Sequence, residues 1–258
     1  MDDDKTMIKE IIKAGKFKRT FFVCPPALIL STWISIVIAF FSIKKRITPN
    51  QLTVLMIPCA ILASIFFACN GLVCTIIGTL LIHTWFAIDK ADGEVARCTK
   101  RYSKFGEELD FLSHHFGHVF FICSFSYVMY SMKQASIIEA LLLLSGMLFC
   151  EYSFRNMCSI QALIYRKIRI NEDPNKKYDM KASNRKPSFV SITKRVLIFV
   201  IDLFHSCDNY VMIGSLIIYI DIFCGTRILF YLSIIFVFAS LLNTFWQSLD
   251  LLKTAYKS

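Results

Sequence analysis

The chain has 258 residues, of which 55% are hydrophobic, and a formal net charge of +10. Its apolar residues come in long blocks, which is typical of a polytopic α-helical membrane protein and excludes an ordinary soluble domain. The basic residues lie mostly between these blocks, where they anchor loops against anionic lipid, so we do not expect nucleic acid as a partner. The ten cysteines include no C-x-x-C pair, and we predict neither a disulfide framework nor a cysteine-bound zinc ion.

Residues 7–47 are predicted to form an N-terminal cytoplasmic and interfacial segment. Residues 1–6 resemble part of an added leader, with Met7 as a natural start, and they enter no functional argument. Residues 26–43 form an uncharged apolar run, near the lower limit for crossing a hydrocarbon core of ~30 Å. Basic residues flank this run on both sides, which favours an amphipathic segment at the interface over a membrane span.

Residues 48–258 are predicted to form an all-α membrane domain of six transmembrane helices. The second predicted loop, residues 98–104, and the long loop 164–196 are strongly basic, and both fall on the same side of the membrane as the two termini. The positive-inside bias therefore places both termini in the cytoplasm of a multi-pass protein, which we assign to a bacterial inner membrane. The six predicted spans are 51–70, 72–97, 107–131, 136–163, 197–220 and 226–249.

Acidic residues cluster where the second span ends and the third begins. Asp89 and Asp92 are three residues apart and share a helix face, while Asp110, His114 and His118 are spaced by four and share a face of the next helix. Charged groups at membrane depth are costly and indicate function. Because carboxylates that meet so closely repel each other, we predict a divalent metal site at the cytoplasmic ends of these spans.

The surroundings of these acids favour a phosphate-bearing ligand. Gly93 and Ala96 lack bulk, so a ligand can approach the backbone closely. A metal ion with a basic rim is the arrangement expected around a phosphate ester or diphosphate, whose charge builds up during transfer. The rim is formed by Arg97, Lys100, Arg101 and Lys104.

This stretch resembles the motif of the CDP-alcohol phosphotransferase (CDP-alcohol phosphatidyltransferase) family. The family pattern is D-x-x-D-G-x-x-A-R, eight residues, then G-x-x-x-D-x-x-x-D. The chain matches seven of the eight fixed positions without a gap and has His114 at the last one. The run Pro49-Asn50-x-x-Thr53 is similar to the segment before that family's first span. The matching positions are Asp89, Asp92, Gly93, Ala96, Arg97, Gly106 and Asp110.

The resemblance implies transfer of a substituted phosphate from a CDP-linked donor to an alcohol acceptor, with release of CMP, in phospholipid or glycolipid and glycan biosynthesis. It implies Mg²⁺ or Mn²⁺ as cofactor, membrane lipid as surroundings, and a homodimer. The metal ligands would be Asp89, Asp92, Asp110 and His114. The nucleotide would be bound by Asn50, Thr53, Asp89, Gly93, Ala96, Arg97 and Gly106.

The departure at His114 concerns both the base and the metal. In the family, the last motif aspartate is the base on the acceptor hydroxyl, and an imidazole is a competent replacement near neutral pH. Imidazole is also a poorer ligand for Mg²⁺ than for Mn²⁺ or Zn²⁺, so Zn²⁺ enters as an alternative metal. Side chains expected to bind the acceptor or its phosphate are Lys104, His118, Arg155 and Arg195.

Two further acidic residues are expected in the later spans, and two other functions are alternatives to the transferase. Glu151 and Arg155, four residues apart, are expected to neutralise each other, and Asp208 is expected in the middle of the fifth span. One rival is a catalytically inactive relative that binds CDP compounds or scaffolds a membrane complex. The other is a metal-ion transporter. Two features argue against it: the acids lie at the helix ends, and the G-x-x-A-R spacing serves no purpose in ion passage.

Overall fold

The structure, a computed structural model, describes residues 2–15, 25–69, 71–171 and 206–255. Within these ranges every regular element is an α-helix, and no strand is present. The helices are α1 (Asp2–Ala14), α3 (Pro25–Lys44), α4 (Pro49–Ala68), α5 (Leu72–Thr99), α6 (Gly106–Ser131), α7 (Ile137–Asn171), α9 (Cys207–Cys224) and α10 (Ile228–Ala255).

Five of these helices are long and apolar enough to cross a membrane: α4, α5, α9, and the stretches Ile137–Met157 of α7 and Ile228–Leu249 of α10. The predicted class, a polytopic helical membrane protein, is confirmed. The third predicted span forms helix α6 but falls outside this set. Its first half carries the acidic residues and histidines of the cluster, which lower its hydropathy.

Local sequence signals explain where the central helices begin and end. Thr48 caps α4 through a reciprocal capping box with Gln51, and Pro49 occupies the first turn, where its missing N–H is harmless. Helix α5 ends at Lys100, whose φ of 54° is left-handed. The short loop that follows reverses the chain into α6, so the acidic end of α5 lies beside the acidic start of α6.

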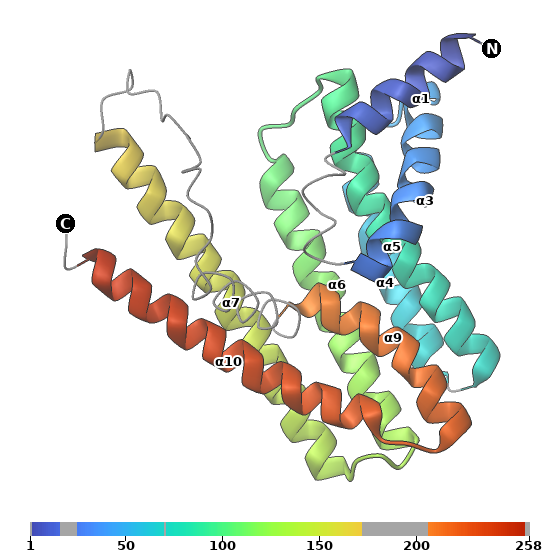
Figure 1. Cartoon of the computed structure of the whole chain (residues 1–258), viewed down its shortest axis with the longest axis vertical. Helices are drawn as coiled ribbons and strands as arrows, with labels where there is room; N and C mark the ends of the chain where they lie inside the picture. The colour runs from blue at the N-terminus through green and yellow to red at the C-terminus, as the bar shows by residue number, and fades with distance from the viewer. Residues whose placement is uncertain (1, 16–24, 70, 172–205, 256–258) are drawn as a thin grey trace, which may run out of the picture.

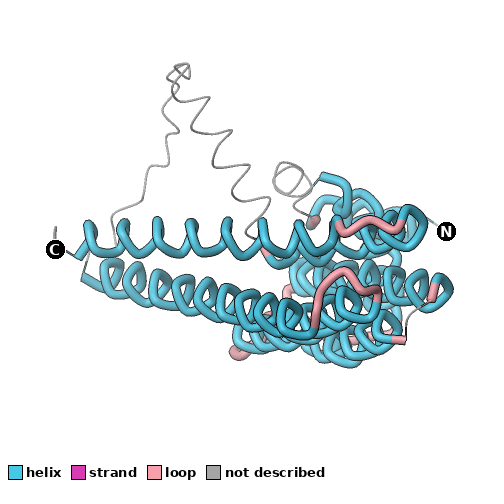
Figure 2. Tube along the Cα trace, turned by 90° about the horizontal axis from the view of Figure 1, so that it is seen from below, coloured by secondary structure: helices cyan, strands magenta, loops and turns pink. Residues whose placement is uncertain are grey.

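Helices α4, α5 and α6 form the centre of the bundle, and α7 and α10 pack against each other and extend beyond it (Figures 1 and 2). Small residues on α4, Ala60 and Ala63, are fully buried and allow close helix approach. Phe67 of α4 meets Phe125 of α6 edge to face, with ring centroids 5.3 Å apart. Because aromatic pairs favour this geometry, the contact helps to fix α4 against α6.

Helix α3 packs along α5 with its polar side inward. Lys90 of α5 donates to the hydroxyls of Ser31 and Thr32, at 2.8 and 3.1 Å, and Ser35 donates to Glu94 at 3.2 Å. Large apolar side chains occupy the outward face of α3, namely Trp33, Val37 and Phe41. This polar-inside, apolar-outside arrangement suits a helix in contact with lipid.

Helix α1 covers the end of α3 and α5. Ile11 is fully buried there, and Asp4 pairs with Lys44 at 2.8 Å. The Lys44 ammonium holds the pKa of the exposed Asp4 carboxyl below its usual value. Residues 2–5, excluded from the functional argument above, thus form part of α1.

Candidate functional site

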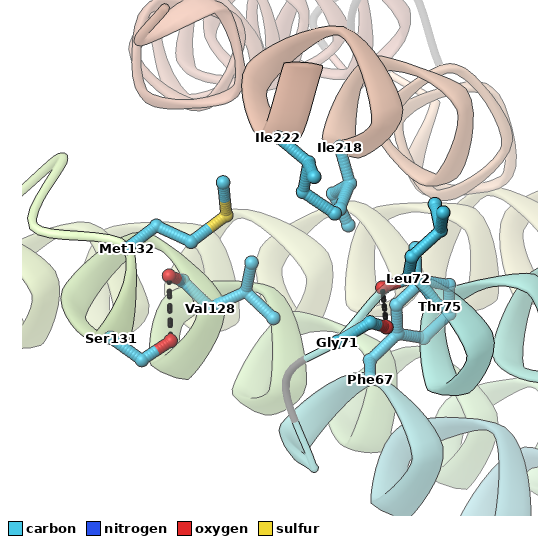
Figure 3. Close-up of a pocket in the computed structure, with 9 residues that line it drawn as sticks. All are labelled: Phe67, Gly71, Leu72, Thr75, Val128, Ser131, Met132, Ile218 and Ile222. Atoms are coloured by element: carbon cyan, nitrogen blue, oxygen red, sulfur yellow. Dashed lines mark hydrogen bonds between the residues drawn. The ribbon is translucent and has the colours of Figure 1, made fainter. Parts of the chain in front are cut away.

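Two cavities distinguish the two ends of the bundle. The one shown in Figure 3 has a volume of about 260 Å³ and lies where α4 ends and α5 begins, with α6 and α9 at its sides. The hydroxyls of Thr75 and Ser131 donate to the carbonyls of Gly71 and Val128, each at 3.0 Å. Among its described lining residues none is ionisable.

The second cavity, of about 290 Å³, lies at the opposite end, where α4 begins, α5 ends and α6 begins. It opens beside the acidic cluster and contains most of the motif residues. Because its walls combine small residues, acids and one arginine, it has the character of a site for a polar, charged ligand. It is lined by Pro49, Asn50, Thr53, Asp92, Gly93, Ala96, Arg101, Tyr102, Ser103, Gly106, Glu107 and Asp110.

Helix α4 positions the acidic end of α5. The Thr53 hydroxyl donates to Asp92 Oδ2 at 2.6 Å, and the Thr53 carbonyl accepts from Ser113 of α6 at 3.1 Å. Asn50 donates to the Ser103 hydroxyl at 3.0 Å and so joins α4 to the loop before α6. The Pro49-Asn50-x-x-Thr53 run therefore borders the cavity.

The carboxylates of α5 and α6 meet at His114. Its Nε2 lies 2.9 Å from Asp89 Oδ1 and 3.5 Å from Asp110 Oδ1. One ligand atom from each of these three residues lies within 4.8 Å of the others. Asp110 Oδ1 is buried and has no hydrogen-bond partner, an arrangement that is costly without a counter-ion. Carboxylate oxygens with one imidazole nitrogen suit a divalent cation, so these residues fit the implied metal.

Trp85 of α5 forms the floor beneath His114. The indole is fully buried, and its ring centroid lies 4.8 Å from that of His114 and 5.8 Å from that of His118. A Cβ at Gly117 would come within 2.9 Å of the Trp85 ring. Helix α6 therefore approaches Trp85 this closely because position 117 carries no side chain.

A second polar cluster lies behind His114. His118 is buried, with Nδ1 2.7 Å from Glu151 Oε1 and Nε2 2.7 Å from Asp208 Oδ1. Arg155 donates to Glu151 through Nε, and its Nη2 lies 2.8 Å from His118 Nδ1. The expected Glu151–Arg155 pair is present, and it is joined to α6 and α9 through His118.

Asp208 differs from its expected place. It lies in the first turn of α9, which begins at Cys207, and not in the middle of a span. The predicted fifth span began at residue 197, and its start falls outside the described residues, as does Arg195. At this position the Asp208 side chain is 44% exposed and faces both His114 and His118.

Three predicted ligand-binding residues lie away from the cavity wall. The Arg97 guanidinium folds back over α5, so that a Cβ at Gly93 would meet its Nη1 at 2.8 Å. Lys104 is exposed in the loop before α6 and does not line the cavity. Arg155 is bound to Glu151 on α7 and stacks over Phe111 at 5.3 Å. Lys90 donates to the Ser31 and Thr32 hydroxyls of α3.

The fold and the site together define a helical membrane protein. At one end of its helix bundle, a cluster of acidic residues suited to a metal ion lies beside a polar cavity. A family model described as CDP-alcohol phosphatidyltransferase matches residues 46–220, more than half of the chain, and the chain belongs to this family. The family comprises transferases that move a phosphate group from a CDP-alcohol to an acceptor in lipid synthesis. No match was found among the curated proteins.

Proposed function

We propose that this chain transfers a substituted phosphate from a CDP-linked donor to an alcohol acceptor and releases CMP, in phospholipid or glycolipid and glycan biosynthesis. The observation that carries the proposal is the convergence of Asp89, Asp110 and His114 within 4.8 Å, next to a cavity walled by Asp92 and small residues. This arrangement places acids, an imidazole and a ligand space together at one end of the bundle.

The acids would hold the implied divalent metal, Mg²⁺ or Mn²⁺, or Zn²⁺ because of the imidazole. Asp89, Asp92 and Asp110 supply hard oxygen ligands, and His114 supplies one nitrogen. When bound, the ion neutralises charge on the donor diphosphate and on the departing CMP. The Thr53 hydroxyl, 2.6 Å from Asp92 Oδ2, orients that carboxylate.

The cavity holds the nucleotide. Gly93, Ala96 and Gly106 on its wall leave room for a base and ribose, and Asn50 and Thr53 border it from α4. Arg101 also lines the cavity, where its positive charge favours a diphosphate. We assign Arg97 a supporting role, in which its guanidinium packs over Gly93 and shapes the wall from outside.

His114 is the base. Its Nε2 faces the carboxylates of Asp89 and Asp110, at the place where donor and acceptor would meet. Because Nε2 has a single lone pair, it takes the proton of the acceptor hydroxyl while it is not bound to the metal ion. The acceptor oxygen then forms a bond to the β-phosphorus in line with the departing oxygen. The bond from that phosphorus to the bridging oxygen breaks, and CMP leaves with the electron pair.

The distribution of basic residues indicates on which side of the membrane the reaction takes place. The basic loop 98–104 and the site lie at the same end of the bundle, and the positive-inside bias assigns that end and both termini to the cytoplasm. We also propose a homodimer, because the family resemblance implies one.

A panel of CDP donors tests this proposal on purified protein, with CMP release measured over a titration of Mg²⁺, Mn²⁺ and Zn²⁺. At least one donor is expected to yield CMP in a metal-dependent way, and Asp110→Asn to lower this release about 100-fold or more. If no donor or metal yields CMP and Asp110→Asn binds CDP donors like the wild type, the enzyme proposal fails. A wild type that binds a CDP donor tightly but never turns it over would support a binding-only relative.

A further inference from the structure

A continuous line of polar contacts leads from the metal carboxylates through three helices. Asp89 contacts His114 at 2.9 Å, His114 Nδ1 faces Asp208 Oδ1 at 4.0 Å, and Asp208 binds His118 at 2.7 Å. His118 continues to Glu151 and Arg155 on α7. The two rings lie 5.7 Å apart between centroids. Each imidazole therefore stands between two acidic groups.

The two nitrogens of His114 face different partners. Nε2 faces Asp89 and Asp110 at the reacting end, and Nδ1 faces Asp208 behind the ring. Histidines that bind metal commonly donate their second N–H to a carboxylate, which fixes the ring orientation and the tautomer. The 4.0 Å separation exceeds a hydrogen bond, and such contacts are often long in unliganded sites and shorten when ligand binds.

We propose that Asp208 is a positioning residue for His114. Its carboxylate accepts the Nδ1 proton, holds the imidazole plane, and leaves the single Nε2 lone pair directed at the reacting end, toward Asp89 and Asp110. The carboxylate that the motif lacks at position 114 is thus supplied by α9, one layer behind the imidazole. This inference rests on the proposed function for its catalytic consequence, but the ring orientation itself is independent of turnover.

The neighbours of Asp208 are built to hold it. His118 has little freedom, because it is 3% exposed and Glu151 fixes its other nitrogen at 2.7 Å. Arg155 in turn binds Glu151. Asp208 also lies in the first turn of α9, where the unpaired N–H groups of a helix stabilise an acid. One oxygen of Asp208 forms a hydrogen bond with His118, and the carboxylate can still accept a hydrogen bond from a second donor.

The direct test measures the tautomer of His114 without substrate. Protein labelled with ¹⁵N-histidine would be examined by two-bond ¹H–¹⁵N correlation, with the signals of His114 assigned from their loss in His114→Gln. The spectra are recorded with Mg²⁺ present, because the Asp89 carboxylate otherwise accepts the Nε2 proton across 2.9 Å; with the ion bound we expect the proton on Nδ1 in the wild type. In Asp208→Asn the amide N–H₂ group can donate to Nδ1, so the proton is expected on Nε2. Glu139→Gln, an acid-to-amide change at the exposed start of α7, is the matched control and leaves the tautomer unchanged.

Kinetics supply the second readout. Asp208→Asn is expected to lower kcat by about 10–100-fold, to leave the donor KM within about two-fold because the cavity is untouched, and to be partly rescued in Asp208→Glu. His118→Gln keeps the carboxylate but removes its anchor, and is expected to lower kcat less. This second variant tests the chain of contacts even if Asp208→Asn fails to fold.

The outcomes separate this inference from the proposed function. A changed tautomer in Asp208→Asn, in a protein that never releases CMP, would leave the positioning role intact and defeat the proposed function. Unchanged tautomer and kcat in an active protein would overturn the positioning role alone. Loss of Mn²⁺ binding as complete as in Asp89→Asn would make Asp208 a metal ligand and would also overturn it.

Discussion

His114 Nε2 lies 2.9 Å from Asp89 Oδ1, although the two residues are 25 positions apart on different helices. The contact joins the last position of the motif to its first. It exists because the loop after Lys100 reverses the chain and brings the start of α6 against the end of α5. The predictions below follow from this meeting point and from the packing that supports it.

Asp110→Asn tests the role of the buried, unpartnered carboxylate oxygen. The change preserves shape but removes the negative charge that a divalent cation requires. We expect CMP release to fall about 100-fold or more, which exceeds the typical loss when a residue that only supports a metal ligand is changed. Mn²⁺ binding, measured by isothermal titration calorimetry, is expected to be lost in parallel. Glu108→Gln, an exposed acid near the start of the same helix, is the control. Similar losses in both variants would show that the effect is not specific to the site.

His114→Asp restores the family motif and tests the link between position 114 and metal choice. A carboxylate prefers Mg²⁺, whereas an imidazole favours Mn²⁺ or Zn²⁺. We expect the wild type to be more active with Mn²⁺ or Zn²⁺ than with Mg²⁺, and the variant to shift toward Mg²⁺, in assays that titrate each ion. His115→Gln is the control on the adjacent position. An identical metal ranking in wild type and His114→Asp would disprove the assignment of His114 as a ligand.

Thr53→Val removes the hydroxyl that donates to Asp92 Oδ2 at 2.6 Å. Hydrogen bonds to charged groups contribute about 1.5–3 kcal/mol, so kcat/KM for the donor is expected to fall by roughly 10-fold or more. The matched control is Thr84→Val, because the Thr84 hydroxyl donates to the Leu80 carbonyl of its own helix, at 2.8 Å. Equal kinetics for Thr53→Val and wild type would mean that α4 does not position Asp92.

Gly117→Ala tests the floor of the site by stability. The added Cβ would lie 2.9 Å from the fully buried Trp85 ring, and such overpacking costs about 1–3 kcal/mol. We expect a lower midpoint of thermal unfolding in detergent, together with reduced activity because Trp85 underlies His114. Gly146→Ala is the control, since its Cβ would meet Val237 at an ordinary 3.5 Å. A Gly117→Ala midpoint at or above that of Gly146→Ala would contradict the packing.

Several features could be predicted from sequence because they depend on spacing along one helix. Asp89 and Asp92 share a face of α5, and Asp110, His114 and His118 share a face of α6, as their three- and four-residue intervals require. Their meeting follows from the short connecting loop. The order of the helices and the membrane character of most of them likewise follow from the long apolar blocks, whereas α6 carries the polar cluster and falls outside the five candidate spans.

The position of Asp208 could not be predicted, because the contact joins helices 90 residues apart. No interval along one helix specifies which face of α9 meets α6. The expected mid-span place of Asp208 was wrong because α9 begins at Cys207. The folding of Arg97 over Gly93 was also missed, since a long side chain can turn toward the cavity or back over its own helix.

The most direct measurement of the central claim is ³¹P NMR of purified protein with a CDP donor, a divalent ion and a panel of alcohol acceptors, run with and without each acceptor. The account predicts that CMP and a new phosphodiester form in equal amounts, only when metal and acceptor are both present, and not with His114→Gln. CMP that appears equally without acceptor, or a product formed at the wild-type rate by His114→Gln, would contradict it.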